Sequence, residues 1–510
     1  MNRALVSTTD KTGLIDFVSS LVDIGWEIIA TSGTAEFLRE GGIPVRTVEE
    51  EFGVSSLLGG RVKTLDWKLF SCILYRGEED ISELEKHGVK PFSLVVVNLY
   101  AFERKVKGGA SIEEAVEHID IGGVSLIRAA AKNFFYVGCV SDPSQYPVVL
   151  NELKTSGRLS FPTRLWLARE AFARVSAYDA GIREFLDREM ASEKSSFPSF
   201  TTVYLKKVRD LRYGENPHQP AALYHTGMGK SIADAIQLQG KDLSFNNILD
   251  ADSALSCVLS FDEPACVIVK HTSPCGVGIG ETASEAFQRA YDGDSLSAFG
   301  GIVALNRVCD STTAELMGEI FLEVVIAPGF TEEALGILRK KKNLRLLSVS
   351  WIQDYTPLPW WEVRGIRGGV LMQEADWRAD DEEEWEVVSD RLPTDEEWLA
   401  MRFAWKVVRF VKSNAIVLAN RYQTVGIGMG QASRVDAVRL AVQKMGGRNE
   451  GVVMASDAFF PFRDAIDVAA DAGIFAVIQP GGSIRDEEVK QAVREHNMAM
   501  VFTGKRHFRH

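Results

Sequence analysis

Lys270 and His271 are the neighbouring residues whose types and position best suit acid–base chemistry. They follow the apolar run 265–269, which predicts a buried strand, and the Pro and Gly residues of 274–278 are expected to turn the chain away. Open α/β sheets place their chemistry beyond the carboxyl ends of strands. A histidine there can act as a general base near neutral pH, and an adjacent lysine can stabilise developing negative charge. Taken alone, such a pair is more often part of an ordinary loop, so other motifs must decide.

Other segments of the same half carry side chains that suit a phosphorylated heterocycle. The loop 212–219 combines a guanidinium, an aromatic ring and a turn, which suits a phosphate and a flat ring. Residues 412–414 begin an apolar strand, and the glycine-rich 426–431 precedes a helix, where backbone N–H groups can face an anion. Residues 458–464 hold three Phe around a Pro, which indicates either an aromatic corner of the core or a platform for a pteridine-like ring. The basic tail 505–510 is expected to be solvated and frayed.

Loops that precede helices also carry polar side chains in the first half of the chain. Ser, Thr and Lys residues occupy 7–11 and 31–34, where amides and hydroxyls can cradle a phosphate. Two basic residues lie in the flexible turn 59–64, and Asp120 leads into a helix that bears Lys132. An Asp that pairs with a Lys can tune proton transfer. The shared position of these residues at strand-to-helix loops predicts one second site.

Alternating strand and helix signals predict an α/β protein with a mostly parallel sheet in its first half. The first half has strand signals at 3–7, 26–30 and 94–97 and helix signals at 12–23, from Ala35 onward and at 163–189. Strands of the second half are expected at 265–269, 302–305, 415–419, 424–428, 451–455, 474–479 and 498–502. The small, polar segment 191–200 is the expected domain boundary, and the acidic segment 376–397 is expected to be a solvated excursion or linker. No strict short-period repeat occurs.

The composition is that of an ordinary globular protein, with 46% hydrophobic and 25% charged residues. A length of 510 residues predicts about two to four domains. The net charge of −13 argues against broad binding to nucleic acid or membrane surfaces. Neither a long apolar run nor a signal pattern is present. The six Cys are scattered without a CxxC pair, which indicates reduced thiols and a cytoplasmic protein.

Taken in order, a set of longer motifs makes the chain resemble the AICAR transformylase/IMP cyclohydrolase family of bifunctional purine-biosynthesis enzymes. The motifs are DKTGL, GGRVKTL, NLYAF, IDIGGVSLIRAAAKN, LRYGENPHQ, VKHTSPCGVG, SAFGGIVALN, KSNAIV, GIGMGQASRV, SDAFFPFRD and QPGGS. The resemblance implies an IMP cyclohydrolase domain at 1–195 with a methylglyoxal-synthase-like fold. It implies an AICAR transformylase domain at 200–510, made of two cytidine-deaminase-like subdomains that divide near 360–400. It also implies a homodimer.

The resemblance implies that the transformylase moves a formyl group from 10-formyltetrahydrofolate, a co-substrate, to the 5-amino group of AICAR. That amine is a poor nucleophile because its lone pair is delocalised towards the carboxamide, so a base must remove its proton as the C–N bond forms. His271 matches the family's base, Lys270 its partner at the folate, and Asn414 the Asn near the formyl group. Matching substrate-binding positions are Arg212, Tyr213, Phe299, Gly300, Val435, Phe459, Pro461, Phe462, Asp464, Arg506 and Phe508.

The resemblance further implies that the cyclohydrolase closes formyl-AICAR to IMP with loss of water. Lys63 and Tyr100 match the groups that stabilise the oxyanion, whereas Asp120 and Lys132 match those that handle the proton of the attacking nitrogen. Matching substrate-binding positions are Ser7, Thr9, Lys11, Thr31, Ser32, Gly33, Thr34, Arg61, Thr64, Asn98, Gly122 and Gly123. Neither step implies a metal or a tightly bound cofactor.

Departures from the family pattern leave alternatives open. Residues 66–70 replace a usual His-Pro sequence, and Ala101 replaces a Pro. One alternative is therefore a monofunctional transformylase whose impaired cyclohydrolase domain serves dimerisation. A non-enzymatic nucleotide sensor is disfavoured, because the matched catalytic residues occur together. A zinc deaminase would need a PCxxC pair, and Pro274-Cys275 is followed by no second Cys at that spacing.

Overall fold

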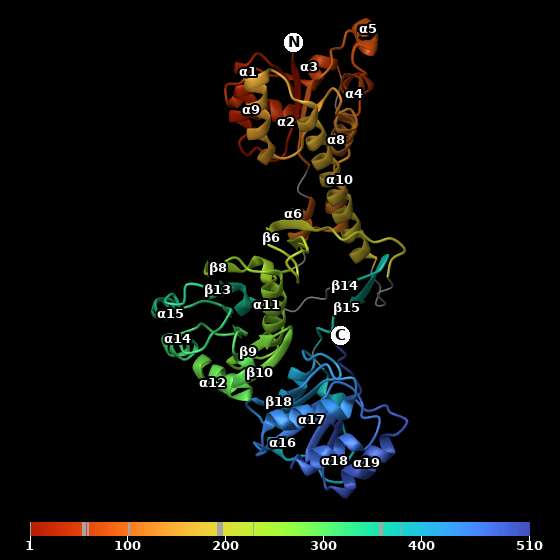
Figure 1. The fold of residues 1–510 in the computed structure, drawn as a ribbon. Helices are drawn as coiled ribbons and strands as arrows, with labels where there is room; N and C mark the ends of the chain where they lie inside the picture. Colours follow the sequence, from red (N-terminus) through yellow and green to blue (C-terminus); the bar gives the residue numbers. More distant parts are fainter. Residues whose placement is uncertain are drawn as a thin grey trace. The chain divides into compact units, whose positions relative to one another are not determined.

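The computed structural model describes residues 2–53, 58, 61–99, 102–190, 197–227, 229–355, 361–378 and 380–510. The chain forms two compact units, Met1–Tyr204 and Leu205–His510 (Figure 1). Each unit contains sheets flanked by helices, which confirms the predicted α/β class. Residues 191–196 of the expected boundary lie outside the described part of the chain.

The first unit is built on a five-stranded sheet in which all neighbouring strands are parallel, as predicted. The strands are β1 (Arg3–Ser7), β2 (Glu27–Ala30), β3 (Arg46–Thr47), β4 (Leu94–Val97) and β5 (Gly138–Val140). Their order is β3-β2-β1-β4-β5. The carboxyl ends of β1, β2 and β4 therefore lie side by side, and the matched polar residues follow these ends.

Helices cover both faces of this sheet (Figure 1). They are α1 (Leu14–Asp23), α2 (Ser32–Glu40), α3 (Val48–Phe52), α4 (Trp67–Leu74), α5 (Glu78–Lys86), α6 (Phe102–Lys107), α7 (Ile112–Val116), α8 (Gly122–Lys132), α9 (Tyr146–Ser156) and α10 (Phe161–Glu189). Along β1, Ala4 and Val6 pack into one apolar cluster with α1, α2 and α9. Leu5 packs into a second cluster with α4, α8 and α10. Because side chains alternate along a strand, an apolar strand is buried on both sides.

The second unit contains two six-stranded sheets and two separate hairpins. The first sheet comprises β8 (Ile236–Gln239), β9 (Ala265–Lys270), β10 (Ser273–Ile279), β11 (Ile302–Leu305), β12 (Val324–Ala327) and β13 (Arg345–Ser348). The second comprises β16 (Glu386–Val387), β17 (Ile416–Ala419), β18 (Thr424–Gly428), β19 (Val453–Ser456), β20 (Ala476–Gln479) and β21 (Ala499–Phe502). The hairpins are β6 (Lys206–Leu211) with β7 (Ala221–His225), and β14 (Trp361–Ile366) with β15 (Gly369–Glu374). The helices are α11 (Phe245–Val258), α12 (Ala283–Gly293), α13 (Ser295–Ala298), α14 (Ser311–Gly318), α15 (Glu332–Leu338), α16 (Asp395–Val408), α17 (Arg434–Met445), α18 (Asp464–Asp471) and α19 (Asp486–Glu495).

The two six-stranded sheets have the same connectivity. Their orders are β10-β9-β11-β12-β13-β8 and, taken in the matching direction, β18-β17-β19-β20-β21-β16. In each sheet an antiparallel hairpin adjoins three mutually parallel strands, and the strand that comes first in the chain closes the far edge antiparallel. The unit is therefore a structural duplication, which the sequence did not reveal as a repeat.

The two sheets meet through β10 and β18. The backbone N–H of Ile279 donates to the carbonyl oxygen of Tyr422 (2.8 Å), and the N–H of Val277 donates to the hydroxyl of Thr424 (3.0 Å). One apolar cluster runs continuously from α11 to α16 across this junction. The two sheets therefore share a core.

Glycines in β10 and β18 allow the next helix to lie close to the strand. A Cβ on Gly276 would lie 1.9 Å from the carbonyl oxygen of Ala290 in α12, and one on Gly428 would lie 1.9 Å from that of Ala437 in α17. Gly426 and Gly428 of the predicted anion-binding turn thus lie inside a strand, where they serve helix packing.

The described residues of the acidic segment 376–397 are all exposed or half-buried, as expected of a solvated segment, but two of its carboxylates also hold the C-terminal tail. Nδ1 of His507 lies 2.5 Å from Asp376, and its Nε2 lies 3.2 Å from Asp380. Asp380 also accepts hydrogen bonds from Trp405 (2.7 Å) and Arg409 (3.1 Å). Burial opposes the charge on His507, but the two carboxylates outweigh it and raise the pKa of this imidazole.

All six cysteines are buried and free. Within the described ranges, no helix combines the length and the apolar character that crossing a membrane requires.

Candidate active sites

Lys270 is the last residue of β9, and His271 and Thr272 form a two-residue turn into β10. The turn thus comes earlier than predicted, since Pro274 and the following glycines belong to β10. The strand pairing shifts register between Pro274 and Gly276. Such an irregularity tolerates a proline, which has no N–H for the ladder.

The turn lies beside a second predicted segment. Nζ of Lys270 donates a hydrogen bond to the carbonyl oxygen of Phe299 (2.8 Å). The Phe299 ring is 61% exposed, and Gly300 follows with a positive φ of 74° that favours glycine. The side chain of His271 is also exposed. The structure therefore brings Lys270, His271, Phe299 and Gly300 together at an accessible surface.

Asn414 is held by a buried ion pair. Nη2 of Arg434 donates to Oδ1 of Asn414 (2.7 Å), and the Asn414 amide donates to the carbonyl oxygen of Gln431 (2.8 Å). Nη1 of Arg434 lies 2.5 Å from the fully buried carboxylate of Asp457. Val435 follows Arg434 at the start of α17. Neither charged residue was predicted as a site residue, although both lie in the motifs GIGMGQASRV and SDAFFPFRD.

The segment 458–464 was expected to be either an aromatic corner of the core or a platform for a flat ring. Its three Phe side chains differ in burial, so each expectation fits some of them. Phe460 is fully buried in the core of the second sheet. Phe459 and Phe462 are 37% and 46% exposed, and the guanidinium of Arg485 lies 4.6 Å from the Phe462 ring. Pro461 lies between them, and Asp464 begins α18. One ring thus belongs to the core and two are available at the surface.

The C-terminal tail is ordered beside Asn414, contrary to the prediction that it frays. Ser413 donates its N–H to the carbonyl oxygen of Arg509 (2.9 Å), and the Arg509 N–H returns to the Ser413 hydroxyl (3.2 Å). Arg506 stacks its guanidinium 4.7 Å from the partly exposed ring of Phe508. These contacts place both matched tail residues in the same part of the unit as Asn414.

Arg212 and Tyr213 lie in the exposed loop after β6. The Arg212 guanidinium lies 5.4 Å from the Tyr213 ring, and Asn246 of α11 donates to the carbonyl oxygen of Glu215 (3.4 Å). For the residues that the structure describes, no recorded contact joins Arg212 to Lys270 or Asn414. The loop is therefore anchored to the second unit without being gathered to the other site residues.

In the first unit, side chains at the ends of β1 and β2 form a connected polar cluster. The hydroxyl of Thr31 donates to that of Ser7 (3.1 Å), and Nζ of Lys11 donates to the hydroxyl of Thr34 (2.8 Å) and to the carbonyl oxygen of Thr8 (2.6 Å). Burial, followed by the charge of nearby Lys63, lowers the pKa of the Lys11 ammonium.

The end of β4 joins the same cluster. The N–H of Thr9 donates to the amide oxygen of Asn98 (2.6 Å), whose Nδ2 donates to the carbonyl oxygen of Asp10 (2.8 Å). The three strand ends are thereby tied together.

Helix α2 begins at Ser32, not at Ala35 as predicted, so Ser32, Gly33 and Thr34 form its first turn. No side chain caps this end, which leaves N–H groups suited to an anion. The Ser32 hydroxyl donates to Glu49 (2.7 Å).

A second cluster surrounds the start of α8. The Asp120 carboxylate accepts a hydrogen bond from the N–H of Gly123 (2.6 Å). A Cβ on Gly122 would lie 2.4 Å from the Thr64 hydroxyl, and one on Gly123 would lie 2.4 Å from Asp120. Gly122 therefore permits close contact between α8 and Thr64, the residue next to Lys63, and Gly123 makes room for the Asp120 carboxylate.

Lys132 lies at the opposite end of α8 from Asp120. At 1.5 Å per residue, α8 rises about 15 Å from Gly122 to Lys132. Within one chain, Asp120 and Lys132 therefore do not lie close enough to act on the same proton of the substrate. Arg61 pairs with Glu117 at the surface. Tyr100, Gly59 and Gly60 lie outside the described residues.

Residues 66–70, which differ from the family pattern, form a regular start of helix α4. Asp66 caps α4 by accepting hydrogen bonds from the N–H groups of Lys68 (2.8 Å) and Leu69 (3.1 Å), and Leu69 is buried. The changed sequence is thus compatible with an intact fold at this position.

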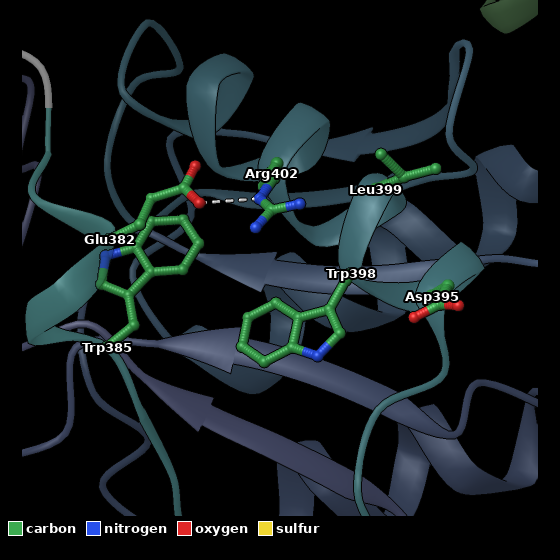
Figure 2. Close-up of a pocket in the computed structure, with 6 residues that line it drawn as sticks. All are labelled: Glu382, Trp385, Asp395, Trp398, Leu399 and Arg402. Atoms are coloured by element: carbon green, nitrogen blue, oxygen red, sulfur yellow. Dashed lines mark hydrogen bonds and ion pairs between the residues drawn. The ribbon is translucent and has the colours of Figure 1, made fainter.

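A hollow of about 350 Å³ lies elsewhere, between the 3-10 turn Glu382–Glu384 and α16 (Figure 2). Figure 2 shows that Trp385 and Trp398 line it and that an ion pair joins Arg402 to Glu382. No matched site residue lines this hollow. Burial raises the pKa of Cys275 to about 12, which disfavours the thiolate that zinc requires. The described residues contain no cluster of three His, Cys, Asp or Glu that could hold a metal ion.

The fold defines an α/β protein of two compact units. The model of the MGS-like domain matches residues 13–125, and the model of the AICARFT/IMPCHase bienzyme matches residues 130–444. The chain belongs to the AICARFT/IMPCHase bienzyme family. It is a bifunctional enzyme of purine biosynthesis, an AICAR formyltransferase and IMP cyclohydrolase.

Similarity to curated relatives extends over the full length. Relatives named bifunctional purine biosynthesis protein PurH include those of Halalkalibacterium halodurans (48% identical over 513 residues) and Anoxybacillus flavithermus (47% over 513 residues). Each comparison covers 100% of this chain and 99% of the relative. One solved structure, titled "Crystal structure of ForH", is 34% identical, with 36% of this chain and 98% of that chain covered and a TM-score of 0.33. The full-length relatives support the bifunctional prediction rather than the monofunctional alternative.

Proposed function

We propose that the second unit transfers the formyl group at the β9–β10 turn, with 10-formyltetrahydrofolate as co-substrate. The observation that carries this proposal is the Lys270–His271 pair at the strand end: the half-buried Lys270 is fixed against Phe299, and His271 is exposed. His271 removes the proton of the AICAR 5-amino group while its nitrogen attacks the formyl carbon. Lys270 stabilises the oxygen that becomes negatively charged. Collapse of the tetrahedral intermediate expels N10 of the folate, which takes up a proton, and yields formyl-AICAR and tetrahydrofolate.

Asn414 completes this site by binding near the formyl group. Its amide is already oriented by Arg434, so little side-chain freedom is lost when substrate binds. Phe459 and Phe462 supply exposed rings for the folate, and Arg506 and Arg212 supply charge for the nucleotide phosphate.

The first unit converts formyl-AICAR to IMP by closing the second ring of the purine. The cluster of Ser7, Lys11 and Thr34, with the first turn of α2, suits the phosphate of formyl-AICAR. The carboxamide nitrogen attacks the formyl carbon, Lys63 and Tyr100 stabilise the oxyanion, and Asp120 takes the proton of the nitrogen. Water then leaves to give IMP. Lys132 takes no part in this proton transfer within one chain, because it lies at the far end of α8.

Two assays on the full-length chain test these assignments separately. The first supplies AICAR and 10-formyltetrahydrofolate and follows tetrahydrofolate release; the second supplies formyl-AICAR and follows IMP. His271→Ala is expected to lose formyl transfer and keep cyclisation, whereas Asp120→Ala is expected to do the reverse. A variant that loses neither activity would refute the role given to its residue.

The protein acts as a homodimer in the cytoplasm. Two observations favour the dimer. The first is that two hairpins, β6–β7 and β14–β15, form isolated two-stranded sheets, and such sheets have marginal stability in water. The second hairpin also exposes apolar side chains, among them Val370 (59%) and Leu371 (58%). The relatives named for purine biosynthesis support the cytoplasmic location. Sedimentation of a fully active monomer would refute the dimer.

A further inference from the structure

The turn that carries His271 has an unusual backbone for its sequence. His271 and Thr272 both have positive φ, 55° and 62°, and Lys270 pairs with Ser273 across them. Two positive φ values define the two-residue hairpin turn that normally contains Asn-Gly or Gly-Gly. A β-branched residue such as Thr is strongly disfavoured there, because its Cβ approaches the following carbonyl oxygen. Some interaction outside the hairpin must therefore maintain this backbone.

Asp250 supplies that interaction. One carboxylate oxygen accepts the N–H of Thr272 at 2.6 Å, and the other accepts the N–H of His271 at 3.3 Å. Successive N–H groups of a turn form a concave site for an anion. The Thr272 hydroxyl donates in addition to the carbonyl oxygen of His271 (2.7 Å). The carboxylate thus binds both amides of the turn, which the hairpin ladder leaves unpaired.

The position of Asp250 is fixed by the helix on which it lies. Helix α11 begins at a Ser244–Asn247 capping box, and its buried residues, Ala251 and Ala254 among them, pack against the strands β9 and β11. The carboxylate is therefore held by the same core that holds β9. Its contacts are made with the backbone of the turn, which leaves the His271 imidazole exposed.

We infer that Asp250 is a positioning residue for formyl transfer: it keeps the His271–Thr272 turn left-handed and so directs the imidazole. This inference rests on the proposed function of His271. A displacement of about 1 Å at a reacting group can cost about 100-fold in rate. The loss of the carboxylate should therefore act on kcat through geometry, without any contact between Asp250 and substrate.

A double-variant experiment separates this role from a direct chemical one. The full-length variants are Asp250→Ala, Thr272→Gly and their combination, with Asp262→Ala, an exposed aspartate that precedes β9, as matched control. Asp250→Ala should lower kcat for formyl transfer about 10- to 100-fold, with a much smaller change in KM for AICAR. Conversion of formyl-AICAR to IMP should be unchanged, as should both activities of Asp262→Ala.

Glycine adopts positive φ without a Cβ clash, so it should replace the support that Asp250 gives. Thr272→Gly added to Asp250→Ala should restore kcat by about 5- to 30-fold, the factor expected from removing one such clash. A combined variant no faster than Asp250→Ala would overturn the inference, because the carboxylate would then act on the substrate or on a proton. An Asp250→Ala variant with the kcat of the native chain would overturn it as well.

Two further variants complete the test. If Asp250→Ala does not fold, Asp250→Asn, which keeps one acceptor oxygen, takes its place with the same Thr272→Gly comparison and the same deciding outcomes. His271→Ala with undiminished formyl transfer would refute the proposed function itself. Loss of activity in His271→Ala together with a native Asp250→Ala would refute only the positioning role.

Discussion

The guanidinium of Arg434 joins Asn414 to Asp457: Nη2 lies 2.7 Å from the Asn414 amide oxygen while Nη1 lies 2.5 Å from the buried carboxylate. The side chains of Arg434 and Asp457 are 5% and 0% exposed. The Asp457 carboxylate also accepts hydrogen bonds from Ser413 and from the N–H of Ala415 (3.2 Å). The half-buried Asn414, which is proposed to bind near the formyl group, is thus oriented by a charge pair in the core.

Removing one member of this pair should destabilise the second unit. Asp457→Ala leaves the Arg434 charge buried without a partner, and breaking such a pair costs about 3–5 kcal/mol. The loss is measured as a decrease in the free energy of unfolding in urea. Asp436→Ala is the control, since Asp436 pairs with Arg439 at the surface, where ion pairs contribute little. Equal losses in both variants would contradict the prediction.

The substitution Gly123→Ala should impair cyclisation but not formyl transfer. Its Cβ would lie 2.4 Å from the Asp120 carboxylate, so Gly123→Ala must displace the residue proposed to take the proton. We expect IMP formation from formyl-AICAR to fall by about 10- to 100-fold, while formyl transfer stays at its native rate. Ser125→Ala, on the same helix, serves as control. The proposed role of Asp120 fails if Gly123→Ala cyclises at the native rate.

The stability that His507 contributes should depend on pH. Both its ring nitrogens face carboxylates, so the protonated form is favoured and its pKa in the folded protein is raised. A raised folded pKa gives a stabilisation that is complete below the unfolded pKa, about 6.5, and is lost as pH rises through the folded value.

The measurement compares the native chain with His507→Gln in urea at pH 6 and at pH 9. The difference in unfolding free energy should be larger at pH 6. Asp376→Asn should weaken this dependence, because it removes one of the two carboxylates. A difference that does not change with pH would show that the imidazole is not charged in the folded protein.

Charges on the exposed hairpin should dissociate the proposed dimer. Val370→Asp combined with Leu371→Asp places two carboxylates on β15, where burial against a second chain would leave them unpaired. Sedimentation is expected to move towards the monomer mass. Ile484→Asp is the control, because Ile484 is fully exposed and lies on neither hairpin. Identical sedimentation of the hairpin variant and the native chain would exclude this surface from the interface.

Much of the fold was predictable because apolar runs of strand length are distinctive. Strands β4 and β11 begin and end where the sequence predicts them. Strand β10 was missed, since Pro274 and its glycines are typical of turns. They occur in a strand because the ladder is irregular at Pro274 and α12 lies too close for a side chain at Gly276. Only the strand pairing revealed that the two sheets have the same connectivity.

Prediction of the sites was limited by partners that are distant in sequence. Motifs pointed to Lys270, His271 and Asn414, but not to the Asp250 and Asp457 carboxylates that orient the last two. The tail was wrongly expected to fray because a run of basic residues gives no sign that His507 meets Asp376, which is 131 residues away. Tyr100 stays a prediction, since it lies outside the described residues.

The matched connectivity of the two sheets implies that this unit arose by doubling of a single gene segment. Its ancestor would have been one sheet that associated with a copy of itself through the hairpin strand, as β10 and β18 do now. After fusion the copies were free to diverge. The hairpin of one half now carries Lys-His at its tip, while the tip of the other, at Tyr422, contacts the end of β10.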